Sequence, residues 1–258
     1  LKRTTCDNSS LLISLIIPEV NMLLAIQTFQ EAIHSQSYQY IIESILPKQS
    51  RDLIYDKWRD DKVLFERNSF IAKIYQDFID EQSDENFAKV IIANYLLESL
   101  YFYNGFNFFY LLASRNKMVG TSDIIRLINR DELSHVVLFR SIVKEIKNDY
   151  PEFFSAETIY SMFKTAVEQE IIWTEHIIGN RVLGITSQTT EAYTKWLANE
   201  RLKSLGLEPL FSGFNKNPYK HLERFADTEG EGNVKSNFFE GTVTSYNMSS
   251  SIDGWEDF

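Results

Sequence analysis

The 258 residues are enough for one large helical domain or two small ones with a substantial buried core. A net charge of −10 disfavours nucleic acid or an anionic membrane surface as the main partner. No apolar run reaches the roughly 18 residues of a membrane span, and only 10 glycines and 5 prolines argue against a turn-rich β fold.

Apolar periodicity, interrupted at proline, glycine and serine, predicts six long helices. Pro18 suits the first turn of a helix that stops before Pro47, and Gly206 is placed as a helix C-cap. The stretch 86–114 is apolar on most sides, so we expect it at the centre of a bundle. The fold class is therefore all-α, and the expected helices span residues 18–45, 54–79, 86–114, 120–146, 155–179 and 187–205.

The two ends of the chain differ from this helical part. From about residue 226 the sequence is charged and Gly-rich, and then rich in Ser, Asn and Gly, which predicts a flexible tail over 226–258. Residues 1–225 form the predicted helical domain, and its N-terminal part is expected to be missing because no initiator Met precedes Leu1. Cys6 is the single cysteine, so a reducing, cytoplasmic location is expected.

Two of the four histidines follow a glutamate at i−3, in the pairs Glu31–His34 and Glu132–His135. On a helix, such a pair leaves the same face and can bind one metal ion. A carboxylate and an imidazole per ion, with bridging carboxylates, favour iron or manganese over zinc. Ferritin-like bundles take one such pair from each of two helices. A single Glu-x-x-His pair is more often a surface feature. The other two histidines, His176 and His221, are not preceded by such a glutamate and are interpreted as structural residues.

A single carboxylate, Glu98, lies in an almost wholly apolar stretch. Its burial is costly unless it is paired or bound to metal. Metal ligation explains the two Glu-x-x-His pairs as well, whereas an ion pair with an Arg or Lys of another helix explains Glu98 alone. Phe102 and Phe106 follow Glu98 at +4 and +8, and therefore lie on one side of the same predicted helix.

Tyr38 follows His34 by four residues, one helical turn further along the metal-facing side. A phenol beside a metal pair and walled by phenyl rings can lose one electron and then be protected from water. On spacing alone, Tyr38 can equally be a core tyrosine.

Three segments resemble, in order, the ligand segments of class I ribonucleotide reductase small subunits: EAIHSQSY (31–38), LESLYFYNGF (97–106) and IIRLINRDELSH (124–135). Residues 198–211 resemble the segment that closes the helical core of that family. The ending, 237–258, is similar to the tail of the class Ib branch. The resemblance covers nearly the whole chain and implies a ferritin-like helical bundle.

The resemblance also implies a role for individual residues. Tyr38 would carry the radical, in an apolar pocket of Phe102, Phe106 and Ile128. Asp131 would orient a histidine ligand and carry coupled proton and electron transfer. The five ligands of two iron or two manganese ions per chain would be Glu31, His34, Glu98, Glu132 and His135.

At the two ends of the chain, the resemblance implies further parts of the machinery. Tyr246 would relay the radical, and Trp255 and Phe258 would dock on the large subunit. A further Asp ligand is expected at or before Leu1, because Asp7 does not fit the family spacing without a deletion.

The implied function is that of the oxidoreductase ribonucleoside-diphosphate reductase, subunit beta, in deoxyribonucleotide synthesis for DNA replication. The metal pair would activate an oxygen species, generate a tyrosyl radical and pass the oxidising equivalent to the large subunit. Expected partners are that subunit, a second copy in a homodimer, and a flavodoxin-like activator protein if manganese is used, with no nucleic acid and no membrane.

Three alternatives remain open at this point. The first is a ferritin-like di-metal oxidase that acts directly on a bound substrate, and the second is a small subunit that stores the oxidant on its metals while Tyr38 stays silent. The third is a helical interaction protein without metal, which metal analysis would distinguish.

Overall fold

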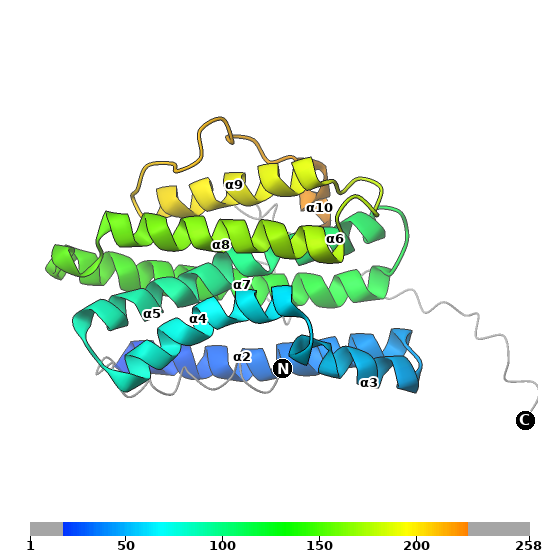
Figure 1. Ribbon diagram of the computed structural model, residues 1–258, viewed down its shortest axis with the longest axis horizontal. Helices are drawn as coiled ribbons and strands as arrows, with labels where there is room; N and C mark the ends of the chain where they lie inside the picture. Colours follow the sequence, from blue (N-terminus) through cyan, green and yellow to red (C-terminus); the bar gives the residue numbers. More distant parts are fainter. Residues whose placement is uncertain (1–17, 227–258) are drawn as a thin grey trace, which may run out of the picture.

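The computed structural model of the chain describes residues 18–226, which form a helical bundle (Figure 1). The predicted all-α class is confirmed, because no strand occurs among these residues beyond one isolated bridge between Val182 and Ile185. The helices are α2 (Pro18–Ile45), α3 (Lys48–Asp56), α4 (Lys62–Asp80), α5 (Asp84–Leu96), α6 (Tyr103–Ala113), α7 (Val119–Asp149), α8 (Ala156–Ile177), α9 (Ser187–Ser204) and α10 (Glu223–Ala226). Short 3-10 turns are η1 (Lys57–Arg59), η3 (Pro151–Phe153) and η4 (Lys220–Leu222), and η2 (Leu97–Tyr101) is a π-helical turn.

Side-chain caps explain where several helices begin. Asp61 accepts a hydrogen bond from the Leu64 amide at the start of α4, and Ser83 caps α5 in the same way. Thr186 and Thr189 form a reciprocal capping box at the start of α9. Each cap satisfies an amide that has no partner within its own helix, which fixes the first turn.

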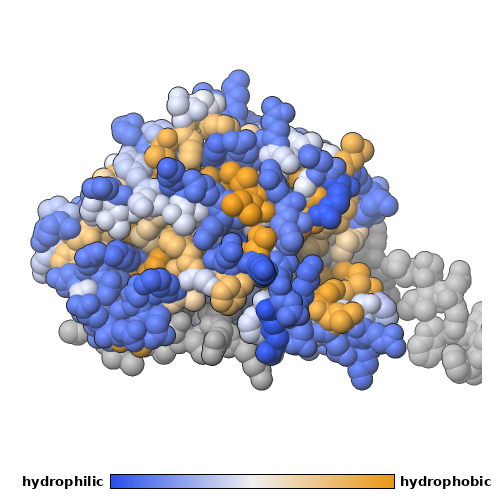
Figure 2. Space-filling model, in the orientation of Figure 1, coloured by the Kyte–Doolittle hydropathy of each residue, from blue (hydrophilic) through white to orange (hydrophobic). Residues whose placement is uncertain are grey.

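The core is built around α5 and α7, which pack against each other and against most other long helices. In Figure 1, α8 and α9 lie toward one side of the bundle and α2 and α3 toward the other. The α5 side chains are buried from Val90 to Leu96, as expected for the central helix. The face seen in Figure 2 is mostly hydrophilic with separate hydrophobic patches.

Two helix predictions are wrong in detail. Residues 54–79 are not one helix, because α3 ends at Asp56 and a new helix begins at Lys62, where Asp61 supplies the cap. Residues 86–114 are interrupted by the π turn η2. The helix predicted over 18–45 is confirmed over the described residues, where α2 spans Pro18–Ile45.

None of the helices between residues 18 and 226 combines the length and apolar character needed to cross a membrane. The predicted tail, with Tyr246, Trp255 and Phe258, lies outside the described residues, as does Asp7.

Candidate metal centre

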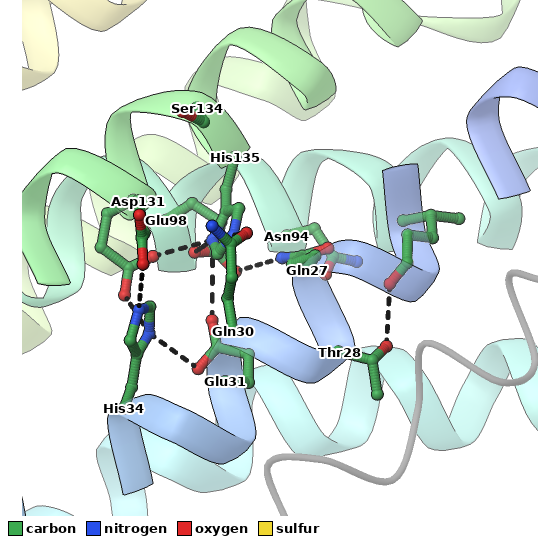
Figure 3. Close-up of polar contacts among 12 residues, drawn as sticks. Gln27, Thr28, Gln30, Glu31, His34, Asn94, Glu98, Asp131, Ser134 and His135 are labelled. Atoms are coloured by element: carbon green, nitrogen blue, oxygen red, sulfur yellow. Dashed lines mark hydrogen bonds and ion pairs between the residues drawn. The ribbon is translucent and has the colours of Figure 1, made fainter. Parts of the chain in front are cut away.

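Four predicted ligands meet in the interior of the bundle (Figure 3). Glu31 comes from α2, Glu98 from the π turn, and Glu132 and His135 from α7. One ligand atom from each lies within 4.8 Å of the others. Glu98 is 5% exposed, and Glu132 and His135 are each 3% exposed, so water cannot solvate this group freely. Three helical segments far apart in sequence therefore supply a compact oxygen and nitrogen cluster.

His34, the fifth predicted ligand, joins the same cluster from α2. Its Nδ1 lies 3.2 Å from Glu132 Oε1 and 3.7 Å from Glu31 Oε2. Its Nε2 lies 3.2 Å from Asp131 Oδ2, on the other side of the ring. A histidine that ligates a metal through one ring nitrogen commonly donates the other N–H to a carboxylate. His34 has this arrangement, with Asp131 as the outer partner that the family resemblance implies.

His135 repeats the arrangement on the other side of the cluster. Its Nδ1 lies 3.1 Å from Glu98 Oε2 and 3.0 Å from Glu132 Oε2. Its Nε2 lies 2.9 Å from Gln30 Oε1. Both histidines therefore turn Nδ1 toward the carboxylates, and Glu132 lies between them.

Electrostatics indicate a site built around a cation. Burial lowers the pKa of His34, but the bonds to Glu132 and Glu31 outweigh it and raise that pKa to about 10. For His135, burial is likewise outweighed by Glu132 and Glu98, and its pKa is also about 10. Burial, followed by the charge of Glu132, raises the pKa of Glu98. The carboxylates thus hold protons on the imidazoles, in the position that metal ions would take.

The donor set fits two divalent ions. Three carboxylates and two imidazoles offer hard oxygen and borderline nitrogen atoms and no thiolate, which suits iron or manganese. Glu132 approaches both histidines with different oxygens, so it can bridge two ions. The buried carboxylates carry negative charges that need compensation, which two divalent ions would supply. Among residues 18–226, Glu98 contacts Gln27 and His135 and forms no ion pair with an Arg or Lys.

The sequence analysis did not identify two glutamines that contact the cluster. Gln27 donates from Nε2 to Glu98 Oε1 at 2.7 Å and is 1% exposed. Gln30 faces His135, as described above. Gln27 precedes Glu31 by four residues and so lies on the ligand side of α2, which was a usable signal. Gln30 precedes His34 by the same four residues and offered the same signal.

Tyr38 lies next to this cluster, beside a cavity of about 210 Å³. Phe102 and Phe106 line the same cavity, and Ile128 is buried on α7. Burial, followed by the negative charges of Glu132 and Glu31, raises the pKa of Tyr38. Its phenol therefore keeps its proton at neutral pH in an aromatic setting.

The remaining histidines lie away from the cluster. His176 Nε2 lies 2.9 Å from Asp61 Oδ2 at the start of α4, and His221 is exposed. Both positions agree with their interpretation as structural residues.

Known proteins resemble this chain along most of its length. The family described as Ribonucleotide reductase, small chain, matches residues 7–218. Ribonucleoside-diphosphate reductase subunit beta of Treponema pallidum is 41% identical over 238 residues, which are 91% of this chain and 67% of that protein. The ribonucleotide reductase R2 subunit from Clostridium botulinum has a TM-score of 0.83 at 44% identity, covering 86% of this chain and 71% of that one. The dimanganese(II)-NrdF of Streptococcus sanguinis shares the fold, with a TM-score of 0.71 at 22% identity over 85% of this chain and 75% of that one.

Proposed function

The chain belongs to the ribonucleotide reductase small-chain family, and on this premise we propose which of its residues generate and protect the radical. It functions as the small subunit of ribonucleoside-diphosphate reductase, an oxidoreductase with a dinuclear metal site. The five residues proposed to hold two iron or two manganese ions are Glu31, His34, Glu98, Glu132 and His135. Once bound, the ions supply one-electron oxidation of a nearby side chain after reaction with an oxygen species.

Tyr38 is the proposed electron donor and radical carrier. The observation that carries this proposal is a protonated phenol, partly buried beside the carboxylates and walled by Phe102 and Phe106. Loss of an electron from Tyr38 would release its phenolic proton, and a carboxylate of Glu31 or Glu132, whose negative charges act on Tyr38, would accept that proton. The phenyl rings then keep water and reductants from the phenoxyl oxygen.

Asp131 is proposed to connect this site to the exterior. Its carboxylate is held 3.2 Å from His34 Nε2, and its side chain is 27% exposed. It can therefore exchange a proton with His34 on one side and with solvent or a partner on the other. This is the geometry expected of a residue that couples proton and electron transfer.

Replacement of Tyr38 by Phe tests the proposal, because it removes the hydroxyl and keeps the ring. We expect the tyrosyl electron paramagnetic resonance signal to disappear while about two metal ions per chain remain bound. Tyr150→Phe is the matched control, since Tyr150 lies at the end of the ligand-bearing helix α7 and is 54% exposed. Persistence of the signal in Tyr38→Phe, or its loss in Tyr150→Phe, would contradict the assignment.

Transfer of the oxidising equivalent requires the large subunit, with which this family pairs. We propose that the tail over 226–258 docks there through Trp255 and Phe258, and that Tyr246 relays the radical. If the ions are manganese, a flavodoxin-like protein would deliver the activating oxygen species. The reaction is expected to take place in the cytoplasm.

A homodimer is the proposed assembly, joined through the outer side of α2. Among the described residues, the side of α2 opposite the ligands exposes a row of large apolar side chains, with Phe29 at 66%. The row repeats at helical spacing, so it forms one continuous stripe. A second copy can cover it by an isologous contact, in which the same stripe serves both subunits. The stripe consists of Met22, Leu23, Ile26, Phe29, Ile33 and Tyr40.

A further inference from the structure

The π turn η2 is where the chain departs most from a regular helix near the metal site. It spans Leu97–Tyr101 between α5 and α6 and carries the ligand Glu98. A π turn adds one residue to the helical path, and it shifts the side chains after it by about 100° relative to those before it. Its carbonyls pair with the amide five residues on instead of four, and where the turn passes into regular α-helix a carbonyl can be left to another donor.

Arg67 of α4 supplies one such donor. Its Nη2 donates to the Tyr101 carbonyl at 2.7 Å, at the end of the turn. Its Nε and Nη2 also donate to Glu170 Oε2 of α8, at 3.0 and 2.9 Å. The guanidinium carbon lies 4.6 Å from the centre of the Tyr101 ring. One side chain thus joins α4, α8 and both the backbone and the ring of a π-turn residue.

Arg67 has little freedom to move from this position. Its side chain is 11% exposed and that of Glu170 is 1% exposed. A buried ion pair persists only with good geometry and further hydrogen bonds. Arg67 makes such further hydrogen bonds, two to Glu170 and one to the Tyr101 carbonyl. Because the Arg67 guanidinium is itself fixed by Glu170, it fixes the position of the Tyr101 carbonyl.

A second arginine contacts the same turn from α9. Arg201 Nε donates to the Ser99 carbonyl at 3.2 Å, and its guanidinium carbon lies 5.1 Å from the centre of the Tyr103 ring. Ser99 directly follows Glu98 in the chain. Carbonyls at two positions of the five-residue turn therefore accept from charged donors, which form stronger hydrogen bonds than neutral ones.

We propose that Arg67 is a positioning residue that, together with Arg201, maintains the π turn and so aims Glu98 at the two metal ions. Arginine is not a metal ligand here, so each of the two acts through the backbone carbonyl that it contacts. Gln27 then orients the Glu98 carboxylate itself. The inference rests on the proposed metal site, and it adds the reason why Glu98 reaches that site.

The test is titration of the full-length, metal-free protein with manganese(II) alone, followed by electron paramagnetic resonance of free and bound ion. Arg67→Lys keeps one charged donor and loses the planar fork. Arg67→Met combined with Glu170→Gln removes the clamp without leaving a buried charge. Arg181→Met is the matched control, because Arg181 also donates to two carbonyls, those of Ile178 and His176, at the far end of α8.

We expect the double variant to bind its second manganese ion about 10- to 100-fold more weakly than the unaltered protein, the usual effect of losing a residue that orients a ligand. The manganese affinity of Arg67→Lys should lie between those of the double variant and the unaltered protein. Arg181→Met should bind manganese as tightly as the unaltered protein. A singly loaded double variant should give the six-line signal of an isolated manganese ion in place of a coupled pair.

Unaltered affinity in a folded double variant would overturn the inference, as would an equal loss in Arg181→Met. If the double variant does not fold, Arg67→Lys decides in the same way against Arg181→Met. If the unaltered protein does not bind two manganese ions, the proposed function is wrong, and this result is independent of the role of Arg67. Amide hydrogen exchange over residues 97–106 would then still test the clamp, with faster exchange in Arg67→Lys than in Arg181→Met as the expected result.

Discussion

The metal centre draws its residues from two kinds of helix. α2 and α7 are uninterrupted, and each presents a Glu-x-x-His pair through ordinary helical spacing. Glu98 instead lies in a π turn, whose carbonyls are held by arginines from two other helices. Local sequence therefore places four of the five proposed ligands, whereas the fifth, Glu98, depends on contacts across the bundle. Loss of a local pair and loss of a remote contact should have different consequences.

Removal of single ligands should give the largest effects. Glu132 lies within 3.2 Å of both histidines, so Glu132→Gln should reduce metal content from two ions to less than one. Glu98→Gln should leave about one ion, because the pairs on α2 and α7 stay intact. Metal analysis after dialysis measures both, with Glu168→Gln on the exposed side of α8 as the control. If Glu132→Gln and Glu98→Gln lose the same amount of metal, the distinction between the ligands on regular helices and the ligand on the π turn is wrong.

The outer side of α2 should respond separately from its ligand side. Phe29→Lys removes one large apolar side chain per subunit and introduces a charge, which we expect to weaken the dimer by about 4 kcal/mol. Metal content should not change, because Phe29 lies on the side away from the ligands. Light scattering coupled to size-exclusion chromatography measures the mass, and Gln76→Lys on the exposed side of α4 is the control. A dimer that survives Phe29→Lys would place the interface elsewhere.

Metal removal should lower the stability of the folded chain, because the ions connect α2 and α7 with the π turn. Ions that bind only the folded chain stabilise it by about 2.7 kcal/mol at a concentration 100 times the Kd. For a domain of this size, each kcal/mol corresponds to a change in Tm of roughly 2–4 °C. We expect the Tm in chelator to be lower by roughly 5–11 °C, measured by circular dichroism. An identical Tm with and without metal would argue against a buried site.

Gln30 should give the smallest effect. Gln30→Ala removes the partner of His135 Nε2 and leaves the metal-facing Nδ1 in place. We expect metal affinity to fall roughly tenfold, which is about 1.4 kcal/mol. Gln39→Ala is the control, since Gln39 bonds only to Glu43 on the exposed side of α2. A competition assay with a coloured chelator measures the affinity, and no change in Gln30→Ala would mean that His135 needs no such support.

The parts that could be predicted from sequence follow from helical spacing. The Glu-x-x-His pairs, Tyr38 and the extent of α2 all depend on neighbours within a few residues. The break before α4 had a local signal in Asp61, a capping residue, but the apolar pattern on both sides concealed it. The π turn had no comparable signal, because its carbonyls are satisfied by Arg67 and Arg201, which are 34 and 102 residues away from them in the chain.

Anomalous X-ray scattering from metal-loaded crystals, measured across the iron and manganese edges, tests the central claim most directly. The account predicts two anomalous peaks among Glu31, His34, Glu98, Glu132 and His135, with both ions contacting Glu132. The edge at which the peaks appear identifies the metal. A single peak, or peaks away from these five side chains, would contradict a dinuclear site at this position.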